Sequence, residues 1–181
     1  MNVDELRVTP IAIPQSSRIA HVYASMDLAD AYSIPLPHGT DTNPQRLADY
    51  IFSRRSVWTT GLMWVRDTLV AGFGLKTSRQ LTSLDAGTLP ARVGIFRIYN
   101  ATEHEIVLGE DDKHLDFRLS ILCLPPTVAD NRHRLVASTV VHCHNRLGRT
   151  YIALISPFHR AIMQASLRRA ARAGWPRAAE Q

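Results

Sequence analysis

The last third of the chain constrains the fold most, because a strand-like pattern there passes directly into a helix-like one. Residues 134–145, RLVASTVVHCHN, are rich in β-branched and other apolar side chains. Beyond a short turn, apolar residues recur at helical spacing, at Leu147, Tyr151, Leu154, Phe158, Ile162 and Ala165. We therefore expect a long strand followed at once by a closing helix that runs to Arg172. Pro157 lies inside the stripe and is expected to kink or split this helix, because proline lacks a backbone donor and clashes with the preceding turn.

The region before residue 55 predicts one strand and one helix. Residues 21–36 alternate loosely between polar and apolar side chains, and they are expected to form the first strand. Its packing residues are expected to be Tyr23, Tyr32, Ile34 and Leu36. Asn43 and Pro44 form a strong helix start, because Asn accepts from free backbone amides and Pro is preset for the first helical position. This helix is expected to end near Arg54.

A second helix and a connection are expected next. Ser56 can cap a helix whose apolar positions are Trp58, Leu62, Trp64, Val65 and Leu69. Residues 72–90 are rich in Gly, Ser and Thr, so they predict a long connection. Four β-rich runs follow, at residues 93–99, 105–109, 114–124 and 134–145, and their short connections favour an antiparallel meander.

This order of elements predicts an α+β fold of the helix-grip type. A curved antiparallel sheet would wrap around a long C-terminal helix, with two shorter helices after the first strand. A chain of 181 residues is long enough for about one domain. We expect an N-terminal extension at residues 1–19, a single domain at 20–173 and a C-terminal tail at 174–181.

Composition narrows the cellular setting and the partners. The N-terminus carries acids where a signal peptide carries bases, and no run of about 18 apolar residues is present. Cys123 and Cys143 lie in apolar runs, which suits buried thiols in a reducing compartment. We therefore expect a cytoplasmic protein without a membrane partner.

The net charge of +5 raises the question of nucleic-acid binding. Several of the arginines lie on or beyond the last helix, without aromatic residues between them on which bases could stack: Arg160, Arg168, Arg169, Arg172 and Arg177. A solvated helix face is the favoured interpretation, and no nucleic-acid partner is expected.

Several segments carry a resemblance to a known family: residues 30–37, DAYSIPLP; 109–118, GEDDKHLDFR; 138–145, STVVHCHN; and 147–160. Over roughly residues 22–170 the chain resembles the bacterial domain-of-unknown-function 2867 family. That family is similar in layout to the START-like, or polyketide-cyclase-like, superfamily, whose members enclose an apolar cavity between the sheet and the final helix. No catalytic residues are established for the family, so the resemblance implies none here. Some relatives carry a nucleotide-binding domain, but this chain has only Gly72-Phe-Gly74, and no cofactor is expected.

A group of histidines carries the sharpest chemical hypothesis. Alternate residues of a strand share a face, so His142 and His144 point the same way, as do His114, Asp116 and Arg118 on the neighbouring run. If those faces align, His114, Asp116, His142 and His144 could form the ligand set of a zinc or non-haem iron site. The alternative, which we favour, is cross-strand polar pairing on an outer face that meets solvent or a partner subunit, without a metal.

The large aromatic residues suggest a cavity instead. Trp58, Trp64, Phe96, Phe117, Tyr151 and Phe158 are spread over every element expected to face the interior. Pockets are lined in this way, although core packing is the stronger interpretation of each aromatic residue taken by itself. His159 is expected to lie off the buried stripe.

Three functions remain open at this point. The favoured one is binding of a small apolar or aromatic molecule between the sheet and the last helix. The second is a cyclase- or hydrolase-like enzyme that uses the histidines, and the third is an interaction module that forms a homodimer through its outer sheet face.

Overall fold

A computed structural model describes residues 6–53, 92–94, 96–128 and 130–178. Within these residues the chain forms an α+β fold of seven strands and two helices. The strands are β1 (Thr9–Ile11), β2 (Leu28–Pro35), β3 (Arg92–Val93), β4 (Phe96–Ala101), β5 (Glu105–Asp111), β6 (Leu115–Leu124) and β7 (Arg134–Cys143). The helices are α1 (Pro44–Ser53) and α4 (Arg146–Arg172).

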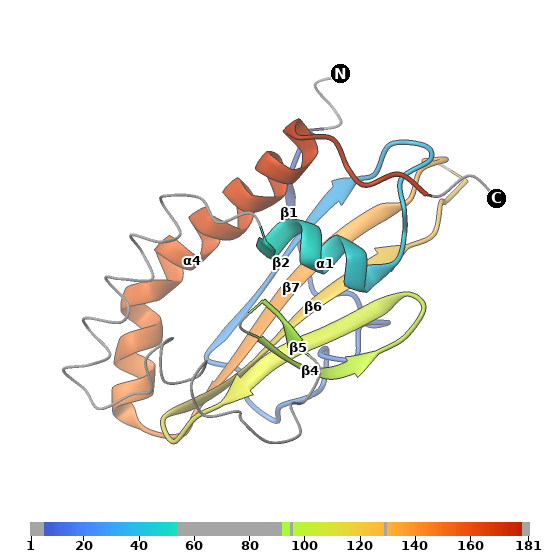
Figure 1. The fold of residues 1–181 in the computed structure, drawn as a ribbon. Coiled ribbons are helices and arrows are strands. Elements are labelled where there is room, and N and C mark those ends of the chain that lie inside the picture. The colour runs from blue at the N-terminus through green and yellow to red at the C-terminus, as the bar shows by residue number, and fades with distance from the viewer. Residues whose placement is uncertain (1–5, 54–91, 95, 129, 179–181) are drawn as a thin grey trace.

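The strands form one curved, antiparallel sheet in the order β1-β2-β7-β6-β5-β4-β3 (Figure 1). The meander from β3 to β7 confirms the antiparallel prediction, and β2 closes it by pairing with β7 from Leu28↔Val141 to Pro35↔Arg134. The predicted strand at residues 93–99 is instead divided between β3 and β4, because Gly94 turns the chain with φ of 59°. Strand β1 was not predicted from the sequence.

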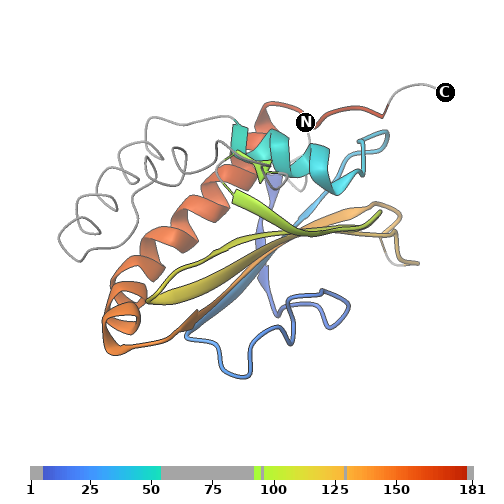
Figure 2. The ribbon, with the colours of Figure 1, turned by 60° about the horizontal axis from the view of Figure 1, so that its bottom comes forward.

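Both helices cover the same face of the sheet (Figure 2). The predicted start of α1 is confirmed, since the Asn43 side chain accepts from the Arg46 backbone N–H at 3.0 Å. The second short helix predicted from Ser56 lies outside the described residues. The predicted α+β class, with a curved antiparallel sheet and a long C-terminal helix, is confirmed, and α1 is the one short helix among the described residues.

Helix α4 confirms the long closing helix but corrects the face that it buries. Its buried residues are Gly148, Ile152, Met163, Ser166, Leu167, Ala170 and Ala171, whereas Leu154 and Phe158 are 58% and 51% exposed. The stripe predicted from the largest side chains does not match the buried face, because the small residues of α4 are the ones that let the helix pack closely against the sheet. A Cβ atom at Gly148 would collide with the carbonyl oxygen of His114 in the β5–β6 hairpin.

Pro157 does not split α4, which continues through it as one helix. Proline has no N–H to donate to the carbonyl of Ala153, four residues earlier. The hydroxyl of Ser156 donates to that same oxygen at 3.3 Å. A side chain thus replaces the missing backbone donor.

The N-terminal segment covers the other face of the sheet, where Figure 2 shows it opposite the helices. We call residues 12–27 the strap. The predicted first strand begins only at Leu28, because residues 21–27 belong to the strap rather than to the sheet. Ile19 is fully buried and packs with Val107 and Val140. The outer face, which was expected to meet solvent or a partner subunit, is therefore partly covered by the chain itself.

A buried carboxylate holds the strap in place. Glu105 is only 3% exposed, and its Oε1 accepts from the hydroxyls of Ser17 and Ser120, each at 2.6 Å. Its Oε2 accepts from the backbone N–H of Arg18 at 3.0 Å. One side chain thus joins the strap to strand β6 as well as to its own strand.

Candidate functional site

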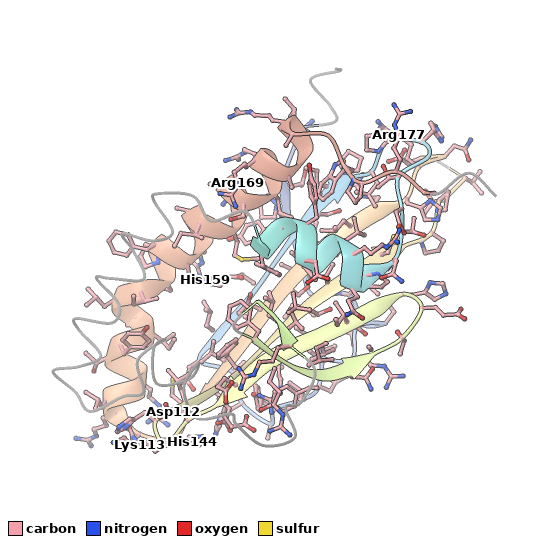
Figure 3. All side chains as sticks on the ribbon, in the orientation of Figure 1. Asp112, Lys113, His144, His159, Arg169 and Arg177 are labelled. Carbon is pink, nitrogen blue, oxygen red and sulfur yellow. The ribbon has the colours of Figure 1, made fainter. Side chains whose placement is uncertain are left out.

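Polar side chains interrupt the apolar layer between the sheet and α4. Asp30 of β2 lies directly opposite Thr139 of β7, and both lie on the face that α4 covers. His159 lies on the side of α4 that faces the sheet (Figure 3). We call Asp30, Thr139 and His159 the inner polar group.

The groups approach one another without forming hydrogen bonds. Nε2 of His159 is 3.6 Å from Oδ1 of Asp30, and Nε of Arg160 is 3.6 Å from Oδ2. Among the described residues, both Asp30 oxygens, Thr139 Oγ1 and His159 Nε2 are buried and lack a hydrogen-bond partner. Leaving a polar group buried and unpaired costs about 1–3 kcal/mol in protein mutational data. A concentration of four such atoms in one place therefore needs an explanation.

Apolar residues surround the inner polar group on two sides. One cluster contains Leu28, Val141, Cys143 and Ile152 near the start of α4. The main core, which includes Tyr32, Met163 and Leu167, lies on the other side. Burial and the neighbouring Asp30 carboxylate raise the pKa of Tyr32 above its ordinary value. The polar atoms thus lie at a break between two apolar clusters.

Three of the six predicted aromatic residues lie in this layer. Phe96 and Phe117 meet edge to face, with ring centroids 5.8 Å apart. Phe117 and Tyr151 both pack against the apolar cluster near the start of α4. Phe158 is half exposed on α4, and Trp58 and Trp64 lie outside the described residues.

The predicted histidine cluster lies on the outer face, at the edge of the strap. Nε2 of His144 is 3.1 Å from Oδ1 of Asp116, and the rings of His142 and His144 meet edge to face at 5.3 Å. His142 also stacks on Tyr23 of the strap at 5.6 Å. The side chain of His114 contacts Asn145 instead, with 2.9 Å between the two nitrogens. The structure thus brings together three of the four predicted residues.

Arg118 lies beside this cluster and is largely covered. Its guanidinium donates to Asp111 at 2.7 Å and lies 3.7 Å from the ring centre of Tyr99. Burial raises the pKa of Tyr99 and of Tyr23 to about 12, and nearby carboxylates add to the shift. Burial alone would raise the pKa of Asp111, but hydrogen bonds from Arg118 and Tyr99 hold it below its ordinary value.

Sequence reasoning missed the inner polar group. Asp30 occupies an apolar position in the alternation of β2, between Leu28 and Tyr32, and this was the available signal. His159 was expected off the buried stripe, but the true phase of α4 brings it to Asp30. No set of three or more His, Cys, Asp or Glu side chains in the described part of the chain is arranged to hold a metal ion.

A pocket of about 370 Å³ opens elsewhere, beside the loop that follows β2. Its lining includes His38, Thr40, Asn131 and His133, and no residue of α4 contributes to it. The C-terminal segment lies near this loop, where the backbone of Arg177 pairs with that of Thr40 in an isolated antiparallel β-bridge. This pocket is therefore distinct from the predicted cavity between the sheet and α4.

Comparison with known proteins gives a match to a protein family. A family described as "Protein of unknown function (DUF2867)" matches residues 22–166, a stretch that contains the inner polar group. Neither the curated proteins nor the solved structures contain a match to the chain. No helix among the described residues is long and apolar enough to cross a membrane.

Proposed function

We propose that this chain, which belongs to the DUF2867 family over a stretch from β2 through most of α4, binds a small molecule between the sheet and α4. The molecule would have an apolar or aromatic body and a hydrogen-bonding head group. The observation that carries this proposal is the inner polar group, whose buried oxygen and nitrogen atoms lack hydrogen-bond partners among the described residues.

The chemistry of the inner polar group indicates the head group. A carboxylate such as that of Asp30 accepts hydrogen bonds, whereas the guanidinium of Arg160 donates them. A hydroxyl both donates and accepts, so one hydroxyl could donate to Asp30 and accept from Arg160 or from His159. A phenol combines such a hydroxyl with an aromatic body. The apolar cluster with Phe117 and Tyr151 would contact that body.

The fold supports the same place for the ligand. The described elements include a curved antiparallel sheet and a long C-terminal helix, two features of the helix-grip layout that the START-like resemblance implies. Proteins of that superfamily hold their ligands between the sheet and the final helix. The physical reason for a ligand at this place is the group of buried atoms without a hydrogen-bond partner among the described residues.

The test compares two probes that differ in one hydrogen-bond donor. Phenol and anisole would be titrated into isotope-labelled protein while backbone amide resonances are followed by NMR. We expect phenol to shift the amides of Asp30, Thr139 and His159 and anisole to bind more weakly. Equal binding of the two probes, or shifts that map to another surface, would refute the proposal.

Two variants make the test specific. Asp30→Asn removes the charge at constant size, and it should weaken phenol binding roughly tenfold, since charge-assisted hydrogen bonds are about twice as strong as neutral ones. Glu103→Gln is the matched control, because Glu103 is exposed in the turn between β4 and β5. Native mass spectrometry of the purified protein would show in addition whether an organic molecule from the cell stays bound.

A further inference from the structure

The two histidines of the outer face are each oriented by a fixed acceptor. Nδ1 of His142 lies 3.0 Å from the backbone carbonyl oxygen of Ser25 and 3.3 Å from the hydroxyl of the same residue, which can donate or accept. Because a carbonyl can only accept, Nδ1 carries the proton of the neutral ring, and the lone pair is on Nε2. Nε2 of His144 lies 3.1 Å from the Asp116 carboxylate, which places the lone pair of its neutral ring on Nδ1.

This arrangement is the one that metal-binding histidines have in proteins. A ligating imidazole almost always donates its other N–H to a backbone carbonyl or to a carboxylate, which fixes the ring and its tautomer. Here one ring has the carbonyl and its neighbour has the carboxylate. The two rings are 5.3 Å apart, and Tyr23 stacks on the first at 5.6 Å.

We propose that His142 and His144 form a two-histidine site for a divalent transition-metal ion of the zinc or copper class. Imidazole nitrogen suits these ions, whereas magnesium and calcium prefer oxygen ligands. The ligands would be Nε2 of His142 and Nδ1 of His144. Two protein ligands leave the remaining positions of a tetrahedral ion to water or to a bound molecule.

The site would also fasten the strap. Ser25 and Tyr23 belong to the strap, and both contact His142. A metal ion bound to Nε2 of His142 strengthens the Nδ1–H as a donor, so it should tighten the hydrogen bond to Ser25. Metal binding is therefore expected to slow amide exchange in residues 23–27.

The experiment uses zinc alone, titrated by calorimetry into metal-free protein without a histidine tag. We expect one ion per chain, and we expect His142→Ala and His144→Ala each to weaken binding at least tenfold. Asp116→Ala should weaken binding by roughly 10- to 100-fold, the range found when such supporting acceptors are removed. His104→Ala is the control, because His104 is an exposed histidine in the turn between β4 and β5.

The outcomes separate this site from adventitious binding. Equal zinc affinity in the parent, His142→Ala and His144→Ala would overturn the proposal, as would a loss in His104→Ala. The side chain of His144 is 38% exposed, so His144→Ala should fold normally, and its circular dichroism spectrum would verify this. Faster exchange in residues 23–27 of the parent on adding zinc would contradict the link to the strap.

Discussion

Glu105→Gln tests whether one buried carboxylate holds the strap on the sheet. The substitution keeps the size of the side chain but replaces one acceptor oxygen by an NH2 group, which can only donate. In the parent, Glu105 accepts from Ser17, Ser120 and the backbone N–H of Arg18. The NH2 group would face at least one of these donors.

The magnitude follows from the number of donors and from the burial. A hydrogen bond to a charged group contributes about 1.5–3 kcal/mol, so three donors give roughly 5–9 kcal/mol before other terms. Two effects offset this loss: the folded state no longer has the desolvation penalty of several kcal/mol for a buried charge, and Gln keeps one acceptor oxygen. We therefore expect the free energy of unfolding to fall by about 2–4 kcal/mol.

Urea unfolding gives the loss of stability, and hydrogen exchange gives its location. Amides of residues 17–20 should exchange faster in Glu105→Gln than amides of β6 and β7, because the strap loses its attachment first. Glu103→Gln, an exposed substitution two residues earlier, should leave both measurements unchanged. An unchanged free energy of unfolding in Glu105→Gln, with strap exchange as in the parent, would refute the reasoning.

Three further predictions concern α4, α1 and the inner polar group. Ser156→Ala should cost about 0.5–1 kcal/mol in urea unfolding, and nearly nothing in a Pro157→Ala background, where a backbone N–H again serves the Ala153 carbonyl. A hydrogen bond from the backbone N–H of Asn43 and the ion pair with Arg46 hold the pKa of Asp41 below its ordinary value. The stability that the Asp41 carboxylate adds is therefore full above about pH 4 and is lost as the pH falls through the lowered pKa. Asp41→Asn should flatten the dependence of the free energy of unfolding on pH in this range. Asp30→Asn should raise the free energy of unfolding by about 1–2 kcal/mol in ligand-free protein, because a buried carboxylate without a hydrogen bond, in contact with His159 and Arg160 only at 3.6 Å, is replaced by a neutral amide.

Local signals in the sequence predicted most of the fold. The start of α1 could be identified because an Asn-Pro pair both caps and begins a helix, and the meander followed from short connections between β-rich runs. Strand β1 could not be predicted in this way, since it has only three residues and contains Pro10. Its place depends on pairing with β2, which is a contact between distant parts of the chain.

The phase of α4 shows a second limit. Large apolar side chains suggested a stripe through Leu154 and Phe158, but the helix packs through Gly148, Ser166 and Ala170. Small residues carry little hydrophobic signal, yet they allow the helix to come close to the sheet and to the β5–β6 hairpin. The error in phase is also why His159 was placed off the buried face.

Polar residues showed the same difference between local and distant information. The His-x-His spacing predicted that His142 and His144 share a face, because that depends only on the alternation of one strand. The pairing of Asp30 with Thr139 and His159 depends on strand register and on helix phase together. No local pattern reports both, so the inner polar group became visible only in three dimensions.

The two buried carboxylates of the sheet lead to opposite expectations, and the contrast argues for a ligand. Glu105 is surrounded by donors, so its replacement should destabilise the fold. The carboxylate oxygens of Asp30 are also buried, but they have no hydrogen-bond partner among the described residues and only ion-pair contacts at 3.6 Å, so the fold gives this charge far less support. Functional sites often contain residues that lower the stability of the fold but are required for binding. If Asp30→Asn stabilises the free protein and weakens phenol binding, the charge serves the ligand; if it destabilises the free protein, Asp30 is a structural residue and the proposed site loses its main support.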